Sequence, residues 1–305
     1  MKKNKFKNIS GLTLLEMLIG VVISSIMMGA IYTTYTVVNN SYSQVTERAK
    51  ISRSGRDIVE MMMRDIRMAG FKYILGTNDL DLPNRSYLEF KGGDVTIAES
   101  HDPLIIEKGE NALGPEDGSY TRINIQDHPD EGSKCCDRIQ IVYDDFNQNH
   151  TDTPYKRYKI IYYAAPITDS DGQRYAAYKT VKSFVQKKGN DTGEWVDDCS
   201  ECYVGEKIRD HIVDMEFVPL DAEGRVISPL PRPGSDPAAR DNLYRIRAVD
   251  VRITFRSRGN FYKFKSTDKP RYVKGLGDRG HNFDDTKLRD SVVVTIHTRN
   301  IGSGI

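Results

Sequence analysis

Glu16 is a carboxylate in a stretch of sequence that otherwise carries no charge. It lies within residues 12–38, a run of apolar and small side chains. An ionised carboxylate in hydrocarbon costs several kcal/mol unless a cation pairs with it, so such a residue is a candidate functional group. We therefore expect Glu16 to work by pairing with a positive charge.

The four cysteines are the next candidates, and all lie beyond the apolar run: Cys135, Cys136, Cys199 and Cys202. Disulfides are typical of exported domains. Because neighbouring cysteines seldom bond to each other, we expect Cys135 and Cys136 to pair with Cys199 and Cys202, in either crossing. A four-cysteine zinc site and a redox pair at Cys199 and Cys202 are the alternatives. The adjacent cysteines give poor spacing for zinc, and no thioredoxin-like context surrounds the second pair.

One acidic segment is a candidate calcium site. Asp145, Asn147 and Asn149 supply alternating oxygen ligands, as in the first half of a calcium loop. His150 and Lys156 stand where an EF-hand has its glycine and its glutamate, so a hydrogen-bonded turn competes with this reading. Apart from this candidate Ca²⁺ site, we expect no cofactor.

Signals of catalysis are weak, and we predict that the chain is not an enzyme. The six histidines are scattered, with no HExxH pattern. Residues 275–280 match GxGxxG, but a dinucleotide site needs a strand before the motif and a helix after it, and the flanking residues indicate a loop. With 44 basic and 43 acidic side chains, the net charge of +1 gives no reason to expect nucleic-acid binding.

The N-terminus predicts a membrane anchor. Residues 1–11, MKKNKFKNISG, contain four lysines and no acid. As a helix, residues 12–38 would span roughly 40 Å, enough to cross a bilayer core of about 30 Å. Because the lysines precede the apolar run, the N-terminus is expected in the cytoplasm and the body on the other side. A plain signal anchor fits the length of the run but leaves Glu16 unexplained.

The segment SGLTLLE, residues 10–16, resembles the cleavage and methylation signature of type IV prepilins and pseudopilins. The resemblance implies that a prepilin peptidase cuts between Gly11 and Leu12, that the Leu12 amine is methylated, and that Glu16 acts in subunit assembly. Most family members begin with Phe, so Leu12 is a mild departure. The freed amine of Leu12 on a neighbouring subunit is a cation that Glu16 could bind, and this pairing would set axial register.

The elements that position these residues can also be predicted. A helical stripe continues the apolar run to Ala69, and Gly70 is a natural C-cap. Period-two patterns then predict strands, within one antiparallel sheet packed on the helix, so the fold class is α+β and pilin-like. The stripe comprises Val45, Ala49, Ser52, Gly55, Val59, Met62, Ile66 and Ala69. The strands are expected at residues 139–143, 155–164, 213–218, 249–255 and 292–298, with turn-rich stretches that include 144–153 and 274–285.

These expectations divide the chain into a leader at 1–11, a transmembrane or filament-core helix at 12–38, a helix continuation at 39–70 and an exported body at 71–305. The end of the helix, residues 63–71, is similar to that of PilW-type minor pilins. This resemblance implies a minor pilin of a type IV pilus, acting at the tip in adhesion or in assembly initiation. Expected partners are other pilins, the prepilin peptidase, the inner-membrane assembly machinery and the membrane. A J-like pseudopilin of type II secretion and a signal-anchored periplasmic enzyme or binding protein are the alternatives.

Overall fold

The structure is a computed structural model, and it describes residues 13–71, 102–108, 135–146, 155–169, 172–186, 193–196, 205–228, 243–262, 271–276 and 280–301. The chain divides into two compact units, Met1–Ala49 and Lys50–Ile305. One helix, α1 (Leu14–Met68, 55 residues), contributes to both units. No proline interrupts it, and this agrees with the helix predicted to Ala69.

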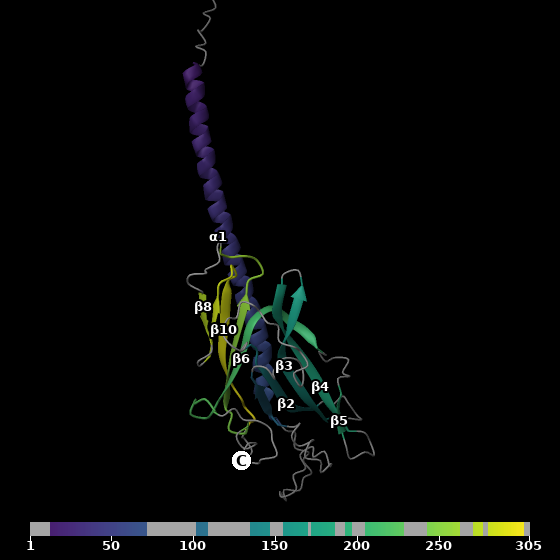
Figure 1. Ribbon diagram of the computed structural model, residues 1–305. Coiled ribbons are helices and arrows are strands. Elements are labelled where there is room, and N and C mark those ends of the chain that lie inside the picture. The colour runs from purple at the N-terminus through teal and green to yellow at the C-terminus, as the bar shows by residue number, and fades with distance from the viewer. Residues whose placement is uncertain are drawn as a thin grey trace, which may run out of the picture. The chain divides into compact units, whose positions relative to one another are not determined.

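The body is built on one large antiparallel sheet (Figure 1). Its strand order is β1-β2-β3-β4-β6-β7-β10, with β5 paired to β4, and β8 and β9 form a separate hairpin. The strands are β1 (Leu104–Glu107), β2 (Arg138–Phe146), β3 (Tyr155–Asp169), β4 (Gly172–Gln186), β5 (Gly193–Val196), β6 (Glu206–Leu220), β7 (Ala248–Arg256), β8 (Arg271–Lys274), β9 (Gly280–Phe283) and β10 (Arg289–His297).

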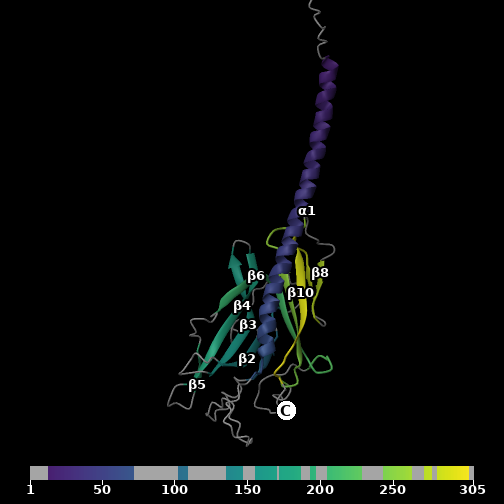
Figure 2. The ribbon, with the colours of Figure 1, turned by 180° about the vertical axis from the view of Figure 1, so that it is seen from behind.

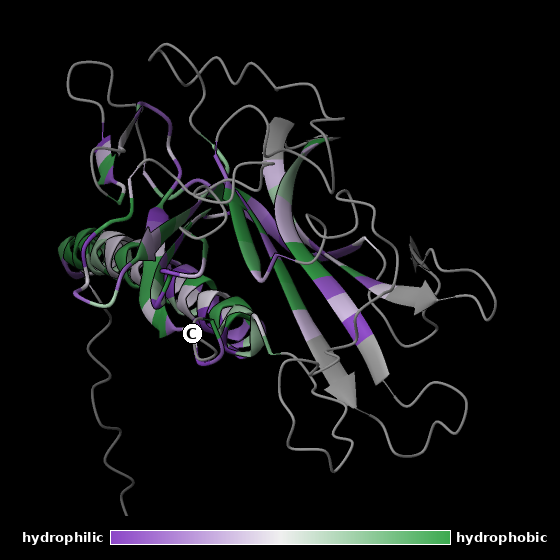
Figure 3. Ribbon diagram, turned by 90° about the horizontal axis from the view of Figure 1, so that it is seen from below, coloured by the Kyte–Doolittle hydropathy of each residue, from purple (hydrophilic) through white to green (hydrophobic). Residues whose placement is uncertain are grey.

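Residues 50–68, the docked segment of α1, lie across one face of this sheet (Figure 2). Met62, Ile66 and Ala69 are fully buried. They pack in one core cluster with sheet residues that include Phe217 and Ile253. Along the strands, apolar and hydrophilic residues alternate (Figure 3), as expected of a sheet with one face on a core. In β7, Val251, Ile253 and Phe255 share a face, which confirms the predicted pattern.

Two glycines set how closely the helix approaches the sheet. A Cβ at Gly55 would lie 2.5 Å from Val292 Cγ2 and 3.0 Å from Phe255 Cε2, so any side chain there would collide with the sheet. Gly70 has a φ of +76°, a conformation that glycine adopts without strain, and it ends the helix as predicted. The Gly70 N–H donates to the Val142 carbonyl at 2.9 Å, and Asn300 Nδ2 donates to the Arg67 carbonyl at 3.2 Å.

A buried polar cluster joins the docked segment to two strands. Lys179 Nζ of β4 lies 2.7 Å from Asp65 Oδ2 of α1, and the Tyr162 hydroxyl of β3 donates to the same oxygen. Tyr162 and Lys179 are direct cross-strand partners. Burial, followed by the negative charge of Asp65, raises the pKa of Tyr162 far above its ordinary value, so the phenol stays protonated and donates.

A second buried pair lies on the other face of the sheet. Arg252 donates to Glu216 at 2.6 Å, and both side chains are nearly inaccessible. The other oxygen of Glu216 accepts the Leu276 N–H at 2.7 Å, in the segment that follows β8. The pair therefore holds the β8–β9 segment to the sheet.

Several expectations need correction. The buried stripe begins near Ser52, because Val45 is 67% exposed and Ala49 is also exposed. Strands β1, β4, β5 and β8 were not predicted. The stretch 274–285 was expected to be a loop, but it contains β9, whose first residue, Gly280, is the last glycine of the GxGxxG match. A strand therefore follows the GxGxxG segment where a dinucleotide site needs a helix.

Candidate functional site

Glu16 lies in the first turn of α1, where its carboxylate closes a capping box with Thr13. Glu16 Oε2 accepts the Thr13 N–H at 2.9 Å and the Thr13 hydroxyl at 2.9 Å. The Glu16 N–H donates back to Thr13 Oγ1 at 3.3 Å. These bonds satisfy backbone donors that a helix start leaves unpaired. The carboxylate also lies at the positive end of the helix dipole.

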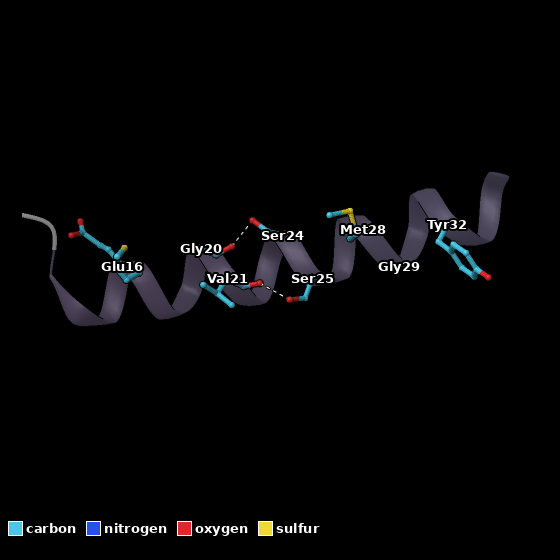
Figure 4. Close-up of a pocket in the computed structure, with 9 residues that line it drawn as sticks. Glu16, Gly20, Val21, Ser24, Ser25, Met28, Gly29 and Tyr32 are labelled. Carbon is cyan, nitrogen blue, oxygen red and sulfur yellow. Dashed lines mark hydrogen bonds between the residues drawn. The ribbon is translucent and has the colours of Figure 1, made fainter. Parts of the chain in front are cut away.

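This geometry fixes where the charge points. The Glu16 side chain extends toward the N-terminal end of α1 (Figure 4). In the sequence, the residue before Thr13 is Leu12, whose amine would become the new N-terminus after cleavage. The carboxylate is thus held against the Thr13 N–H, at the first described residue of the chain.

The same part of α1 has a shallow, open groove (Figure 4). A Cβ added at Gly20 or at Gly29 would meet no other described residue within 4 Å. The Ser24 and Ser25 hydroxyls donate to the carbonyls four residues earlier, both at 2.7 Å, so neither needs an outside partner. Small residues of this kind let another helix approach closely in a membrane. The groove is lined by Glu16, Met17, Gly20, Val21, Ser24, Ser25, Met28, Gly29 and Tyr32.

The surrounding surface is apolar and exposed. Large apolar side chains from Leu14 to Val45 are at least 48% accessible, and they lie on every side of the helix. Leaving so many large apolar groups in water would cost on the order of tens of kcal/mol. The helix is long and apolar enough to cross a membrane, with a mean hydropathy of 2.2 in its most apolar window. Lipid or other apolar helices are therefore its natural surroundings.

Most of the other predicted site residues lie outside the part of the chain that the structure describes. Gly11, Leu12, Asn147, Asn149, Cys199 and Cys202 lie outside the described residues. Asp145 lies in β2, where its backbone pairs with Lys156. Cleavage between Gly11 and Leu12 and calcium binding at Asp145, Asn147 and Asn149 therefore remain predictions.

Cys135 and Cys136 are described, and their sulfur atoms are bonded to each other. The sequence instead favours disulfides from Cys135 and Cys136 to Cys199 and Cys202, and this pairing remains a prediction. Both sulfurs are buried and lie near a carboxylate oxygen of Asp214. While the two sulfurs are bonded, neither is a thiolate that could bind zinc.

Thr13 is the residue of this site that the sequence reasoning missed. The signal was present, because Thr13-Leu14-Leu15-Glu16 has the S/T-x-x-E spacing of a capping box ahead of an apolar run. Glu16 thus has a local partner as well as the predicted distant one.

Comparisons with known proteins support the N-terminal motif. Residues 6–32 match the sequence model of the prokaryotic N-terminal methylation motif, a span that includes Gly11, Leu12, Glu16 and the groove. This motif implies processing by a prepilin peptidase and assembly with pilins. No curated protein matches the chain. A type IV-like pilin from Thermus thermophilus is similar over 83% of this chain and 98% of its own, at 10% identity and a TM-score of 0.36. A likeness this low gives no ground for inferring a shared function.

Proposed function

Since the chain carries a prokaryotic N-terminal methylation motif, we propose that it is a minor pilin of a type IV pilus. A prepilin peptidase cuts after Gly11, and the Leu12 amine is methylated. Before assembly the protein is anchored in the inner membrane, with its body in the periplasm. It then enters the filament, where it acts in assembly initiation or at the tip in adhesion. The PilW-type resemblance at residues 63–71 supports this narrower assignment.

Glu16 carries the proposal. It is the single charge in residues 12–38, and Thr13 holds its carboxylate at the start of the helix. Pairing with the Leu12 amine of a neighbouring subunit would neutralise both charges in a low-dielectric environment and fix axial register. The amine does not exist before cleavage, so processing must precede assembly.

The size of the body supports a minor role. About 230 residues follow the helix, from 71 to 305, and a body of this size would crowd a tightly wound shaft. A position at the tip or in a priming complex avoids this crowding. A J-like pseudopilin shares the same N-terminal chemistry, so the filament in which the protein is found distinguishes the two functions.

Glu16 variants in a strain that lacks the wild-type copy test the proposal. Glu16→Gln and Glu16→Leu should be inserted in the membrane and cleaved, but should be lost from sheared filaments, because both lack the charge. Glu16→Asp should retain part of the incorporation, limited by its shorter reach. Gly11→Val is the processing control, since a β-branched side chain would crowd the cleavage site and keep the leader attached.

Two measurements decide the result. Mass spectrometry of the N-terminus reports cleavage and methylation, and immunoblotting of sheared filaments reports incorporation. Normal incorporation of Glu16→Leu would refute the pairing role. An intact leader on the wild-type protein within filaments would refute the prepilin assignment itself.

A further inference from the structure

The docked segment of α1 has an outward face that the fold leaves to solvent. Four arginines lie on it, namely Arg53, Arg56, Arg64 and Arg67, and all four are exposed. Their spacing places them within about 100° of the helix circumference. The exposed acids Asp57 and Glu60 lie on the same strip. We name this set of six residues the arginine ridge, and its net charge is +2, from four arginines and two acids.

The ridge lies opposite the buried side of the same helix. Met62 and Ile66 are fully inaccessible, and they project from the side of the helix that packs on the sheet. Figure 2 looks onto the outward side. The arginines therefore lie on the solvent side of an amphipathic helix and do not pack in the core.

Ion pairs within the part of the chain that the structure describes do not use these arginines. The ion pairs found among the described residues, such as Arg252–Glu216 and Arg289–Asp285, do not include any of the four. Asp57 and Glu60 are within one turn of arginines, yet no salt bridge joins them in the described part of the chain. Among the described residues no acidic side chain pairs with these guanidinium groups, and their planar fork of donors fits carboxylates.

We propose that the arginine ridge is a docking surface for an acidic helical face on a different filament subunit. This inference rests on the proposed function, because it takes α1 to face neighbouring subunits in the filament. Two copies of this chain meeting ridge to ridge would bring together two surfaces that each carry a net charge of +2, and like charges at an interface oppose association. The ridge thus selects a neighbour of opposite charge and disfavours a homopolymer through this face.

Charge reversal in the full-length protein tests the proposal. Arg53→Glu/Arg56→Glu/Arg64→Glu should lower the amount of protein in sheared filaments by about tenfold or more, because attraction becomes repulsion. Replacing the same three arginines by lysine retains the charge and should keep most of the incorporation. The substituted side chains are exposed, so the unfolding midpoint should not change.

Two control variants separate the ridge from general charge effects. Asp57→Asn/Glu60→Gln makes the ridge more positive and should not reduce incorporation. Lys274→Glu/Arg299→Glu reverses two exposed charges elsewhere on the body and should leave incorporation unchanged. Equal losses in this second control and in the triple reversal would overturn the assignment to the ridge.

Photo-crosslinking identifies the partner in living cells. A benzophenone amino acid at position 60, in the middle of the ridge, should crosslink to a different protein through a segment rich in Asp and Glu. The arginine-to-glutamate variant should lose this adduct. Adducts with a second copy of the chain, or adducts that persist after charge reversal, would overturn the proposal.

Failure of the proposed function would look different. If the wild-type chain were absent from sheared filaments, the pilus assignment would fall, while crosslinking in the membrane would still test the ridge. If Glu16→Leu lost incorporation and the triple reversal did not, the pilus assignment would stand and the docking surface would be wrong.

Discussion

Glu16 has two physically different uses at the start of α1, and substitution can separate them. Its carboxylate caps the helix through Thr13, and its charge is proposed to pair with an amine. The sequence predicted the second use from the isolation of the charge in an apolar run. The first use depends on Thr13, three positions earlier, which carries no charge and therefore does not stand out in the apolar run.

Replacing Thr13 with valine tests the division of these roles. Thr13→Val keeps the shape and the backbone N–H, but it removes the hydroxyl that donates to Glu16. We expect a helix start weakened by about 1 kcal/mol, with cleavage and charge retained. The amount in sheared filaments should therefore fall less than it does for Glu16→Gln. An equal loss, with normal N-terminal processing by mass spectrometry, would show that capping is the main role of Glu16.

Asp285 makes the body sensitive to acid. Its carboxylate receives two hydrogen bonds from Arg289, at 2.5 and 2.6 Å, and a third from the Lys287 N–H at 3.0 Å. Burial is the largest influence and raises the pKa of Asp285, but these hydrogen bonds and the charge of Arg289 together hold it below the ordinary 3.8. A carboxyl whose pKa is depressed by folding stabilises the fold above its unfolded pKa. That contribution is lost as the pH falls through the folded pKa.

Asp285→Asn should therefore lower the urea midpoint at neutral pH. The difference from wild type should shrink as the pH is lowered to about 3 and below. Asp290→Asn, at an exposed carboxylate that accepts only a local bond, is the matched control and should change little. A difference between Asp285→Asn and wild type that is constant with pH would contradict the role given to this carboxylate.

Among the elements, those with a regular apolar pattern could be predicted from the sequence. Strands β2, β6 and β7 contain alternating stretches, β3 and β10 contain short runs rich in β-branched or aromatic residues, and α1 has its apolar stripe and a terminal glycine. Strand β4 was missed because its inward positions Tyr175, Ala177 and Val181 are interrupted by Lys179. This lysine is tolerated inside because it pairs with Asp65, 114 positions away in the sequence. Local periodicity carries no information about such a partner.

The Asp65–Lys179 pair provides a test of how α1 is held on the sheet. Lys179→Met should destabilise the body by about 3–5 kcal/mol, because it leaves a buried carboxylate without its cation. Asp65→Leu/Lys179→Met removes both charges and should recover much of that loss. Urea unfolding of the single and double variants measures the coupling. If the losses simply add, the two side chains do not interact as the structure indicates.

The hairpin β8–β9 was missed for a different reason. The sequence between its two strands is glycine-rich, and each strand is only four residues long. Short strands give too few alternations to be recognised. The ring of Tyr272 occupies the place where a side chain at position 280 would lie, which explains the glycine at that position. Composition alone indicated a loop here, whereas β8 and β9 pair as antiparallel strands.

For the whole molecule, the α+β class and the long N-terminal helix followed from the sequence, but the pairing of the four cysteines in disulfides did not. We expect all four cysteines of the exported protein to be oxidised, so alkylation without reductant should label none of them. Two or more labelled thiols, or stoichiometric zinc, would contradict this. Peptide mapping then identifies the partners. A bridge between the two pairs would close a loop of about 65 residues and stabilise by about 4 kcal/mol in the entropy model. A bond between Cys135 and Cys136 closes no such loop.

The way α1 ends in the body has a mechanical consequence. From Gly55 to Ala69 the docked segment contacts the sheet along its length. Beyond it, Gly70 is hydrogen-bonded to Val142, and Asn300 holds the Arg67 carbonyl. A tensile load applied along the axis of this segment acts along these contacts, so many of them share the strain at once, as in shear. Peeling, in which contacts fail one after another, would require a force across the helix.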